Sequence, residues 1–209
     1  IPHKQNVIPL LDELTDTAKA IGAVNTIHMR NNRLIGDNTD TAGFLIDLTR
    51  FMQEQAPALQ KNALVLGAGG SARGVVFALL NDGWDVTLAA RRLAQAHQLS
   101  TFFTNYELRI TDFTDLRLLT FDLLVNTTSL GMSPNIDQSP LPANLSLSSN
   151  TLIYDLVYNP SETKLVKDAS AKGLFAVNGF GMLIEQAALS FEIWTGHNPP
   201  REIMLSSIS

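Results

Sequence analysis

Gly67, Gly69 and Ala72 are spaced as G-x-G-x-x-A, a pattern that suits the binding of a dinucleotide. Gly67 lets the chain reverse tightly, Gly69 leaves room for a pyrophosphate beside the backbone, and Ala72 lets a helix pack closely on a sheet. The free amides at the start of that helix then face the anion. The alternative is a tight strand-to-helix turn without a ligand, because a glycine pattern alone is weak evidence. The residues expected to hold the phosphates are Gly67, Ala68, Gly69, Gly70 and Ser71.

The residues after the next expected strand indicate which dinucleotide is bound. NAD-binding sequences place an acidic residue there, roughly twenty residues beyond the glycines, to bond the ribose hydroxyls. This chain has Ala90, Arg91 and Arg92 instead. Guanidinium groups pair with a 2′-phosphate that a carboxylate would repel, so we predict NADP. The alternative is that the two arginines only open a solvated helix, although there they oppose the helix dipole.

Alternating strands and helices must position these residues. Apolar runs predict strands at 63–66, 85–89, 106–110, 121–125, 151–156 and 175–177, and helical spacing predicts helices at 71–81, 93–103 and 163–171. This alternation is typical of the α/β class with a doubly wound parallel sheet, a Rossmann-like fold. Flanking this region we expect short helices at 5–11 and 15–22, a hairpin with strands at 23–27 and from 34, and helices at 41–52, at 181–195 and after Pro200.

Composition narrows the class of function. The 209 residues are 45% hydrophobic and 17% charged, which is enough for a large buried core, and the net charge is -5. Basic residues do not form runs, so we expect a small-molecule partner rather than a nucleic acid or a membrane surface. The sequence has no cysteine, which excludes disulfides and thiolate metal sites and is compatible with a reducing cytoplasm. Apolar stretches are too short to span a bilayer, so we expect a soluble protein.

Seven motifs in order make the chain similar to the shikimate dehydrogenase family: IPHK, GAVNT, GDNTD, GAGGSARG, NTTSLGM, YDLVY and GFGMLIEQA. The resemblance runs from Lys4 to the C-terminal helices, as the larger C-terminal part of such a protein. It implies NADP-dependent interconversion of shikimate and 3-dehydroshikimate, in aromatic amino-acid biosynthesis, without a metal. It also implies a Rossmann-like NADP domain at 42–179, inserted into a smaller α/β substrate domain of which 1–41 and 180–209 are parts.

The resemblance assigns the chemistry to Lys4 and Asp40. Oxidising a secondary alcohol by hydride transfer requires removal of the hydroxyl proton, and the reverse reaction requires its return. A lysine in a cleft can do both, as proton acceptor and donor, while Asp40 orients the lysine and a substrate hydroxyl. Without the resemblance, Lys4 would be a solvated surface residue and Asp40 the N-cap of a helix starting at Thr41.

Further contacts follow from the same resemblance. It implies substrate binding by Asn25, Tyr158 and Gln186, beside Lys4 and Asp40. Gln186 interrupts an apolar helix, where a buried amide needs partners, although it could equally lie on the polar face of an amphipathic helix. The remaining implied cofactor contacts are Asp16, Asn126, Thr127, Thr128, Leu156 and Gly179. For Asp16 the alternative is a charge in the first turn of a helix.

The chain departs from the family pattern in two ways. The family's Asn-Arg-Thr is Ala90-Arg91-Arg92 here, and Gln95 replaces a later arginine, which leaves the strength of phosphate binding open. The stretch with the serine pair that grips the substrate carboxylate is absent, so we expect residues before Ile1 and low activity of the 209-residue chain alone. The alternatives are a quinate dehydrogenase and a non-catalytic dinucleotide-binding module. We expect a cytoplasmic protein, and we leave a homodimer open.

Overall fold

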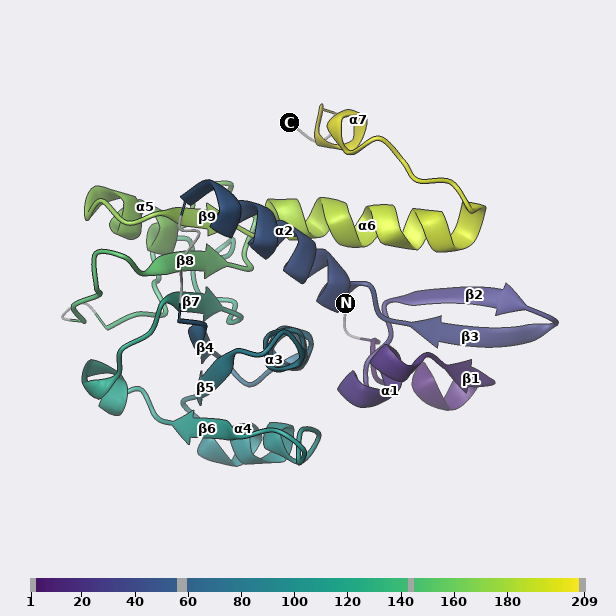
Figure 1. Ribbon diagram of the computed structural model, residues 1–209, viewed down its shortest axis with the longest axis horizontal. Helices are drawn as coiled ribbons and strands as arrows, with labels where there is room; N and C mark the ends of the chain where they lie inside the picture. The colour runs from purple at the N-terminus through teal and green to yellow at the C-terminus, as the bar shows by residue number, and fades with distance from the viewer. Residues whose placement is uncertain (1–2, 56–59, 143–144, 207–209) are drawn as a thin grey trace. The chain divides into compact units, whose positions relative to one another are not determined.

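The computed structural model of the chain describes residues 3–55, 60–142 and 145–206 (Figure 1). It divides into two compact units: unit 1 comprises Ile1–Asp47 and Gly181–Ser209, and unit 2 comprises Leu48–Phe180. The predicted domain boundaries, 41/42 and 179/180, lie close to these divisions and stay predictions. None of the helices within the described ranges is long and apolar enough to cross a membrane.

Unit 2 is built on a parallel sheet, as the alternating pattern predicts. Its six strands lie in the order β6-β5-β4-β7-β8-β9 (Figure 1). The strands are β4 (Asn62–Leu66), β5 (Asp85–Ala89), β6 (Leu108–Thr111), β7 (Leu123–Asn126), β8 (Leu152–Asp155) and β9 (Ala176–Asn178). The helices between them are α3 (Gly70–Asn81), α4 (Leu93–Ser100), the 3-10 helix η2 (Asp115–Leu118) and α5 (Lys164–Ala171). The doubly wound, Rossmann-like fold is confirmed, and its strand order reverses between β4 and β7.

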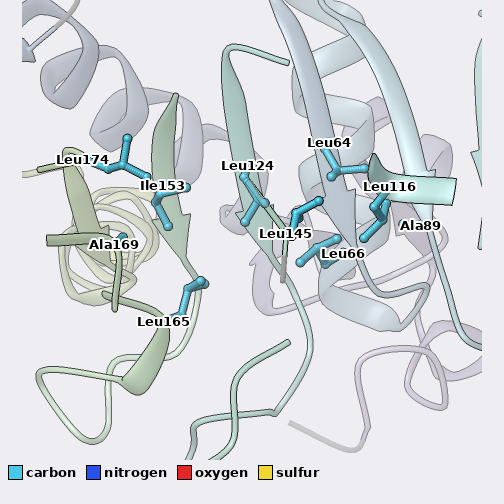
Figure 2. Packing of buried hydrophobic residues seen from close by; sticks show 10 residues of the cluster. All are labelled: Leu64, Leu66, Ala89, Leu116, Leu124, Leu145, Ile153, Leu165, Ala169 and Leu174. Atoms are coloured by element: carbon cyan, nitrogen blue, oxygen red, sulfur yellow. The ribbon is translucent and has the colours of Figure 1, made fainter. Parts of the chain in front are cut away.

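The core of unit 2 explains why its central strands are apolar on both faces. Leu64 and Leu66 of β4, Leu124 of β7 and Ile153 of β8 are all fully buried (Figure 2). They belong to a cluster that also includes Leu165 of α5. Because helices cover both faces of a doubly wound sheet, such strands carry continuous apolar runs instead of alternating with polar residues.

Unit 1 contains a smaller sheet with strand order β1-β3-β2. Its elements are η1 (Ile8–Leu10), β1 (Glu13–Leu14), α1 (Asp16–Ile21), β2 (Thr26–Arg30), β3 (Arg33–Asp37) and α7 (Arg201–Ser206), with the first half of α2 (Asp40–Gln55) and nearly all of α6 (Phe180–Thr195). The β2–β3 hairpin turns at Asn31 and Asn32, which both have positive φ, as a two-residue type I′ turn requires. Thr15 caps α1, and Gly22 ends it in the left-handed region.

Several predicted boundaries are wrong. The strand predicted at 23–27 begins only at Thr26, because Val24 N–H is bonded to the Lys4 carbonyl instead of to a neighbouring strand. The helix predicted at 5–11 is a single 3-10 turn with Pro9 near its start, since proline cannot continue a helical ladder. Helix α4 ends at Ser100 and not at 103, and β6 begins at Leu108 and not at 106. The two-residue strand β1, parallel to β3, is not predicted at all, because two residues carry no periodicity.

Candidate functional site

A cavity of about 580 Å3 lies at the carboxyl ends of β4, β5 and β7 in unit 2. Ligands of doubly wound sheets bind in this place, where the strand order reverses. The cavity brings together several predicted cofactor residues: Gly67, Ala68, Gly69, Ala90, Arg91, Arg92, Thr127 and Thr128. Residues from separate segments of the chain therefore share one pocket.

The glycine-rich turn has the geometry that phosphate binding needs. Gly67 has φ +103°, and a Cβ added there would lie 2.8 Å from Thr127 Oγ1, so the turn excludes other residues. A Cβ added at Gly69 or Gly70 would meet open space. Gly69 is the N-cap of α3 and offers no side-chain acceptor to the first amides of the helix. These amides are thus free to bind an anion beside an open backbone, which fits a dinucleotide pyrophosphate.

Two arginines make the lining of the same cavity basic. Arg91 and Arg92 are exposed residues that line it, together with Gln95. None of the described lining residues carries a carboxylate. These side chains fit a 2′-phosphate better than a free ribose hydroxyl pair. Our sequence reasoning missed three lining residues, Phe113, Leu130 and Pro140; the only available signal was that they follow the expected third and fourth strands.

Asn126, Leu156 and Gly179 lie outside the lining of this cavity. Asn126 is fully buried, and its Oδ1 accepts hydrogen bonds from Thr128 N (2.9 Å) and Thr128 Oγ1 (2.7 Å). Asn126 therefore fixes the conformation of the loop after β7 through its two hydrogen bonds to Thr128. Leu156 and Gly179 are in close contact, since a Cβ added at Gly179 would lie only 2.3 Å from the Leu156 carbonyl oxygen.

We expect Gly179→Ala to destabilise unit 2 by about 1–3 kcal/mol, because the new methyl group would clash with backbone and not with a side-chain end that can rotate away. Urea denaturation of both proteins measures this difference. Gly70→Ala is the control, since a Cβ there meets open space at a helical position and should be neutral or stabilising. Equal stability of Gly179→Ala and the wild type would contradict the close contact.

In unit 1, the predicted catalytic residues are joined directly. Lys4 Nζ donates a hydrogen bond to Asp40 Oδ2, and the two side chains are 32% and 19% exposed. Asn25 Nδ2 donates to Asp40 Oδ1 at 3.0 Å. Asp40 is the first residue of α2, and its carboxylate binds these two side chains instead of capping the helix. The pair is therefore a partly solvent-accessible cation and carboxylate held in one orientation.

Gln186 completes this group from α6. Its Oε1 lies 3.4 Å from Asn25 Nδ2, and its Nε2 donates to the Leu183 carbonyl at 2.9 Å. Gly43 of α2 permits this approach, because a Cβ there would lie 2.7 Å from Gln186 N. The structure thus brings together four of the five residues predicted to bind substrate: Lys4, Asn25, Asp40 and Gln186.

Three hydroxyl groups that the sequence reasoning missed support this cluster. Thr39 Oγ1 and Thr26 Oγ1 lie 3.0 Å and 2.7 Å from Ser190 Oγ. Asn25 Oδ1 in turn accepts hydrogen bonds from Thr39 N and Thr26 Oγ1, both at 2.9 Å. The Thr39 backbone N–H can only donate, so it requires the amide oxygen on its side and fixes the flip of the Asn25 amide, with Nδ2 toward Asp40.

Two further predicted residues, Asp16 and Tyr158, are described within their own units. Asp16 is the first residue of α1, with a fully exposed carboxylate 3.6 Å from Lys19 Nζ, which is the arrangement of a first-turn helix charge. Tyr158 belongs to unit 2, follows β8 and is 43% exposed. Their roles toward cofactor and substrate stay predictions, and Ile1 and Pro2 of the first motif lie outside the described residues.

The fold and the pocket of unit 2 define a dinucleotide-binding α/β protein. Models of three family domains match the chain: the shikimate dehydrogenase substrate binding domain at residues 1–27, shikimate / quinate 5-dehydrogenase at 50–158, and the shikimate 5′-dehydrogenase C-terminal domain at 179–208. The chain belongs to the shikimate dehydrogenase family.

Individual relatives agree with this assignment. A shikimate dehydrogenase (NADP(+)) of Carboxydothermus hydrogenoformans is 41% identical over 213 residues, which cover 100% of this chain and 75% of the relative. A crystal structure of a shikimate dehydrogenase in complex with NADP+ has a TM-score of 0.90 and 37% identity, over 100% of this chain and 73% of that one. The shikimate 5-dehydrogenase of Thermus thermophilus, in complex with NADP(H) and shikimate, has a TM-score of 0.84 and 38% identity, over 97% and 73%. The chain spans about three quarters of the length of these relatives.

Proposed function

We propose that the chain interconverts shikimate and 3-dehydroshikimate with NADP, using Lys4 as the proton-transfer group and Asp40 as its orienting partner. The observation that carries this proposal is the Lys4–Asp40–Asn25 cluster, in a chain whose other unit holds a basic dinucleotide pocket. Family membership supplies the substrate: the relatives that are 41% and 38% identical to the chain are shikimate dehydrogenases.

Lys4 Nζ can serve both directions of the reaction. In oxidation, the carbon that carries the hydroxyl loses its hydrogen as hydride, and the neutral amine form of Lys4 accepts the proton of the same hydroxyl and becomes the ammonium form. In reduction, Lys4 returns that proton to the oxygen that the hydride has made anionic. When bound, NADP+ would accept the hydride in oxidation, and NADPH would supply it in reduction. Asp40 holds the ammonium group of Lys4, and Asn25 holds Asp40, so the proton donor is oriented before substrate binds.

Asn25 and Gln186 complete the proposed contacts with the substrate. Asn25 Nδ2 donates to Thr39 Oγ1 and to Asp40 Oδ1, which uses both of its N–H groups, so a substrate hydroxyl must share or displace one of these bonds. Gln186 is half-buried beside it, with an amide that can reorient toward a hydroxyl or a carboxylate. Tyr158 is proposed as a further substrate contact. A cytoplasmic location and a homodimeric state stay predictions.

The main alternative is quinate as substrate, which carries one additional ring hydroxyl and which the name of the central family model includes. Steady-state turnover of shikimate and of quinate with NADP+ by the complete protein tests the assignment. We expect a higher kcat/KM for shikimate. A preference for quinate would overturn the substrate, and no turnover of either would favour a non-catalytic dinucleotide-binding module.

We expect Arg91→Ala to weaken NADP+ binding by about 1.5–3 kcal/mol, the range for a hydrogen bond to a charged group, and to leave NAD+ binding nearly unchanged. The reason is that only NADP+ has a 2′-phosphate for the guanidinium group to pair with. Calorimetric titration of wild type and variant with both oxidised cofactors measures the selectivity.

Arg109→Ala serves as the matched control for this titration, because Arg109 is an exposed arginine on the adjacent strand β6, outside the residues that line the cofactor cavity. It should change neither affinity. If Arg91→Ala lowered the affinities for NADP+ and NAD+ equally, Arg91 would not contact the 2′-phosphate. A wild type that binds NAD+ more tightly than NADP+ would overturn the assignment of NADP as the cofactor.

A further inference from the structure

Asp155 is a fully buried carboxylate that the proposed chemistry does not use. It ends β8 and accepts three hydrogen bonds. Asn126 Nδ2 (2.8 Å) and Val157 N (3.0 Å) donate to its Oδ1, and Thr163 Oγ1 (2.6 Å) donates to its Oδ2. Burial raises the pKa of this carboxyl group above its ordinary value, while the three donors act in the opposite direction.

The three donors come from three different segments of unit 2. Asn126 ends β7, and its Oδ1 accepts the Thr128 N and Oγ1 bonds, so Asp155 is linked through one side chain to the loop that lines the nucleotide cavity. Val157 follows Leu156, whose carbonyl packs against Gly179. Thr163 is the N-cap of α5, where its Oγ1 also accepts the Val166 N–H. Asp155 is therefore the shared acceptor of two loops and a helix start.

Core packing does not account for a carboxylate at this place. An apolar residue of similar volume would pack against β7 without the desolvation cost that a buried acid carries. What an apolar residue cannot do is hold an amide, a backbone N–H and a hydroxyl at fixed angles at the same time. All three donors lead to the loops after β7 and β8, and these are the segments that carry the predicted cofactor residues Thr127, Thr128 and Leu156.

We propose that Asp155 is a positioning residue for the nicotinamide half of NADP: it sets the loops after β7 and β8 relative to each other without touching the cofactor. This inference rests on the proposed function only in its choice of cofactor. The adenosine half is held elsewhere in the same pocket, by the glycine-rich turn and by Arg91 and Arg92. Loss of Asp155 should therefore affect one half of the cofactor and spare the other.

The test compares the affinities of NADP+ and of 2′,5′-ADP, which has the ribose phosphate but no nicotinamide. We expect Asp155→Ala to raise the Kd for NADP+ at least tenfold and the Kd for 2′,5′-ADP less than threefold, as measured by calorimetry. Asp155→Asn should restore NADP+ to within threefold of wild type. The amide oxygen keeps both Oδ1 bonds, and the amide nitrogen can donate to Thr163 Oγ1.

Asn126→Leu provides a second variant in case Asp155→Ala fails to fold, because it removes the side chain that links Asp155 to Thr128 in the loop after β7 and leaves the Val157 and Thr163 bonds of Asp155 in place. This variant should show the same selective loss of affinity for NADP+, with the affinity for 2′,5′-ADP nearly unchanged. Equal losses for both ligands in the variants, or no loss for either, would overturn the positioning role. A wild type that binds 2′,5′-ADP no better than 5′-AMP would instead overturn the NADP assignment, so the two failures can be told apart.

Discussion

Lys4→Ala should lower kcat for shikimate oxidation by about two to four orders of magnitude, the span of positioned acid-base catalysis. The affinity for NADP+ should stay unchanged, because unit 2 supplies the whole described lining of the cofactor cavity. Steady-state kinetics of the complete protein measure the loss, and NADP+ titration verifies that the variant is folded. If the variant kept most of the turnover, Lys4 would bind substrate without transferring the proton.

Asp40→Asn should also lower turnover, because both carboxylate oxygens of Asp40 accept hydrogen bonds. Asp40 Oδ1 accepts from Asn25 and its Oδ2 from Lys4, so an amide in its place turns an NH2 group toward one of two donors. The Lys4→Ala, Asp40→Asn double variant should be little worse than the worse single variant, since the pair acts as one unit. Additive losses would assign the two residues independent roles.

Lys164→Ala is the matched control for these kinetics. Lys164 forms an i,i+4 ion pair with Asp168 on α5, and both side chains are well exposed to solvent. Such a surface pair contributes little to stability and has no part in the proposed chemistry. The variant should keep wild-type kcat and KM, and a comparable loss there would show that turnover responds to any lysine removed.

Leu66→Ala should destabilise unit 2 by about 2–5 kcal/mol, the range for removing a leucine from a closely packed core. Leu66 is fully buried and packs in the central cluster of the sheet (Figure 2). The chain has two tryptophans, and the buried Trp84 belongs to unit 2. In a Trp194→Phe background, the fluorescence of Trp84 during urea denaturation reports on this unit.

The same variant should still bind NADP+ where it remains folded. The bonds that join Leu66 to the loop after β7 are made by its carbonyl oxygen, to Thr127 N and Thr127 Oγ1, and the substitution leaves that oxygen in place. Saturating NADP+ should therefore recover part of the lost stability by mass action, about 2.7 kcal/mol at a hundredfold excess over Kd. Leu10→Ala, at a position 74% exposed, should change stability by less than about 0.5 kcal/mol. A loss below about 1 kcal/mol for Leu66→Ala would contradict the packing of β4.

The sequence by itself determined the doubly wound sheet, the glycine-rich turn and the basic end of the cofactor pocket. These features depend on short-range patterns: apolar runs of strand length, helical spacing, and glycines at positions where the backbone must turn or approach a ligand. Arg91 and Arg92 could be assigned because in a parallel sheet the end of one strand lies beside the end of the next. The catalytic pair could be assigned only through the resemblance of whole motifs, since one lysine and one aspartate carry no pattern.

Only the tertiary structure decided which groups hold these residues in place. Asn25 is oriented by Thr39 and supported by Ser190, Gly43 allows α6 to approach α2, and Asp155 joins two loops through Asn126. Each of these contacts links residues far apart in the chain, and a serine, a glycine or a buried acid has no periodicity that marks its partner. Hydrogen bonds of this kind depend on distances of about 3 Å and on angles that exist only once the chain has folded. Residue types and local spacing therefore do not predict them.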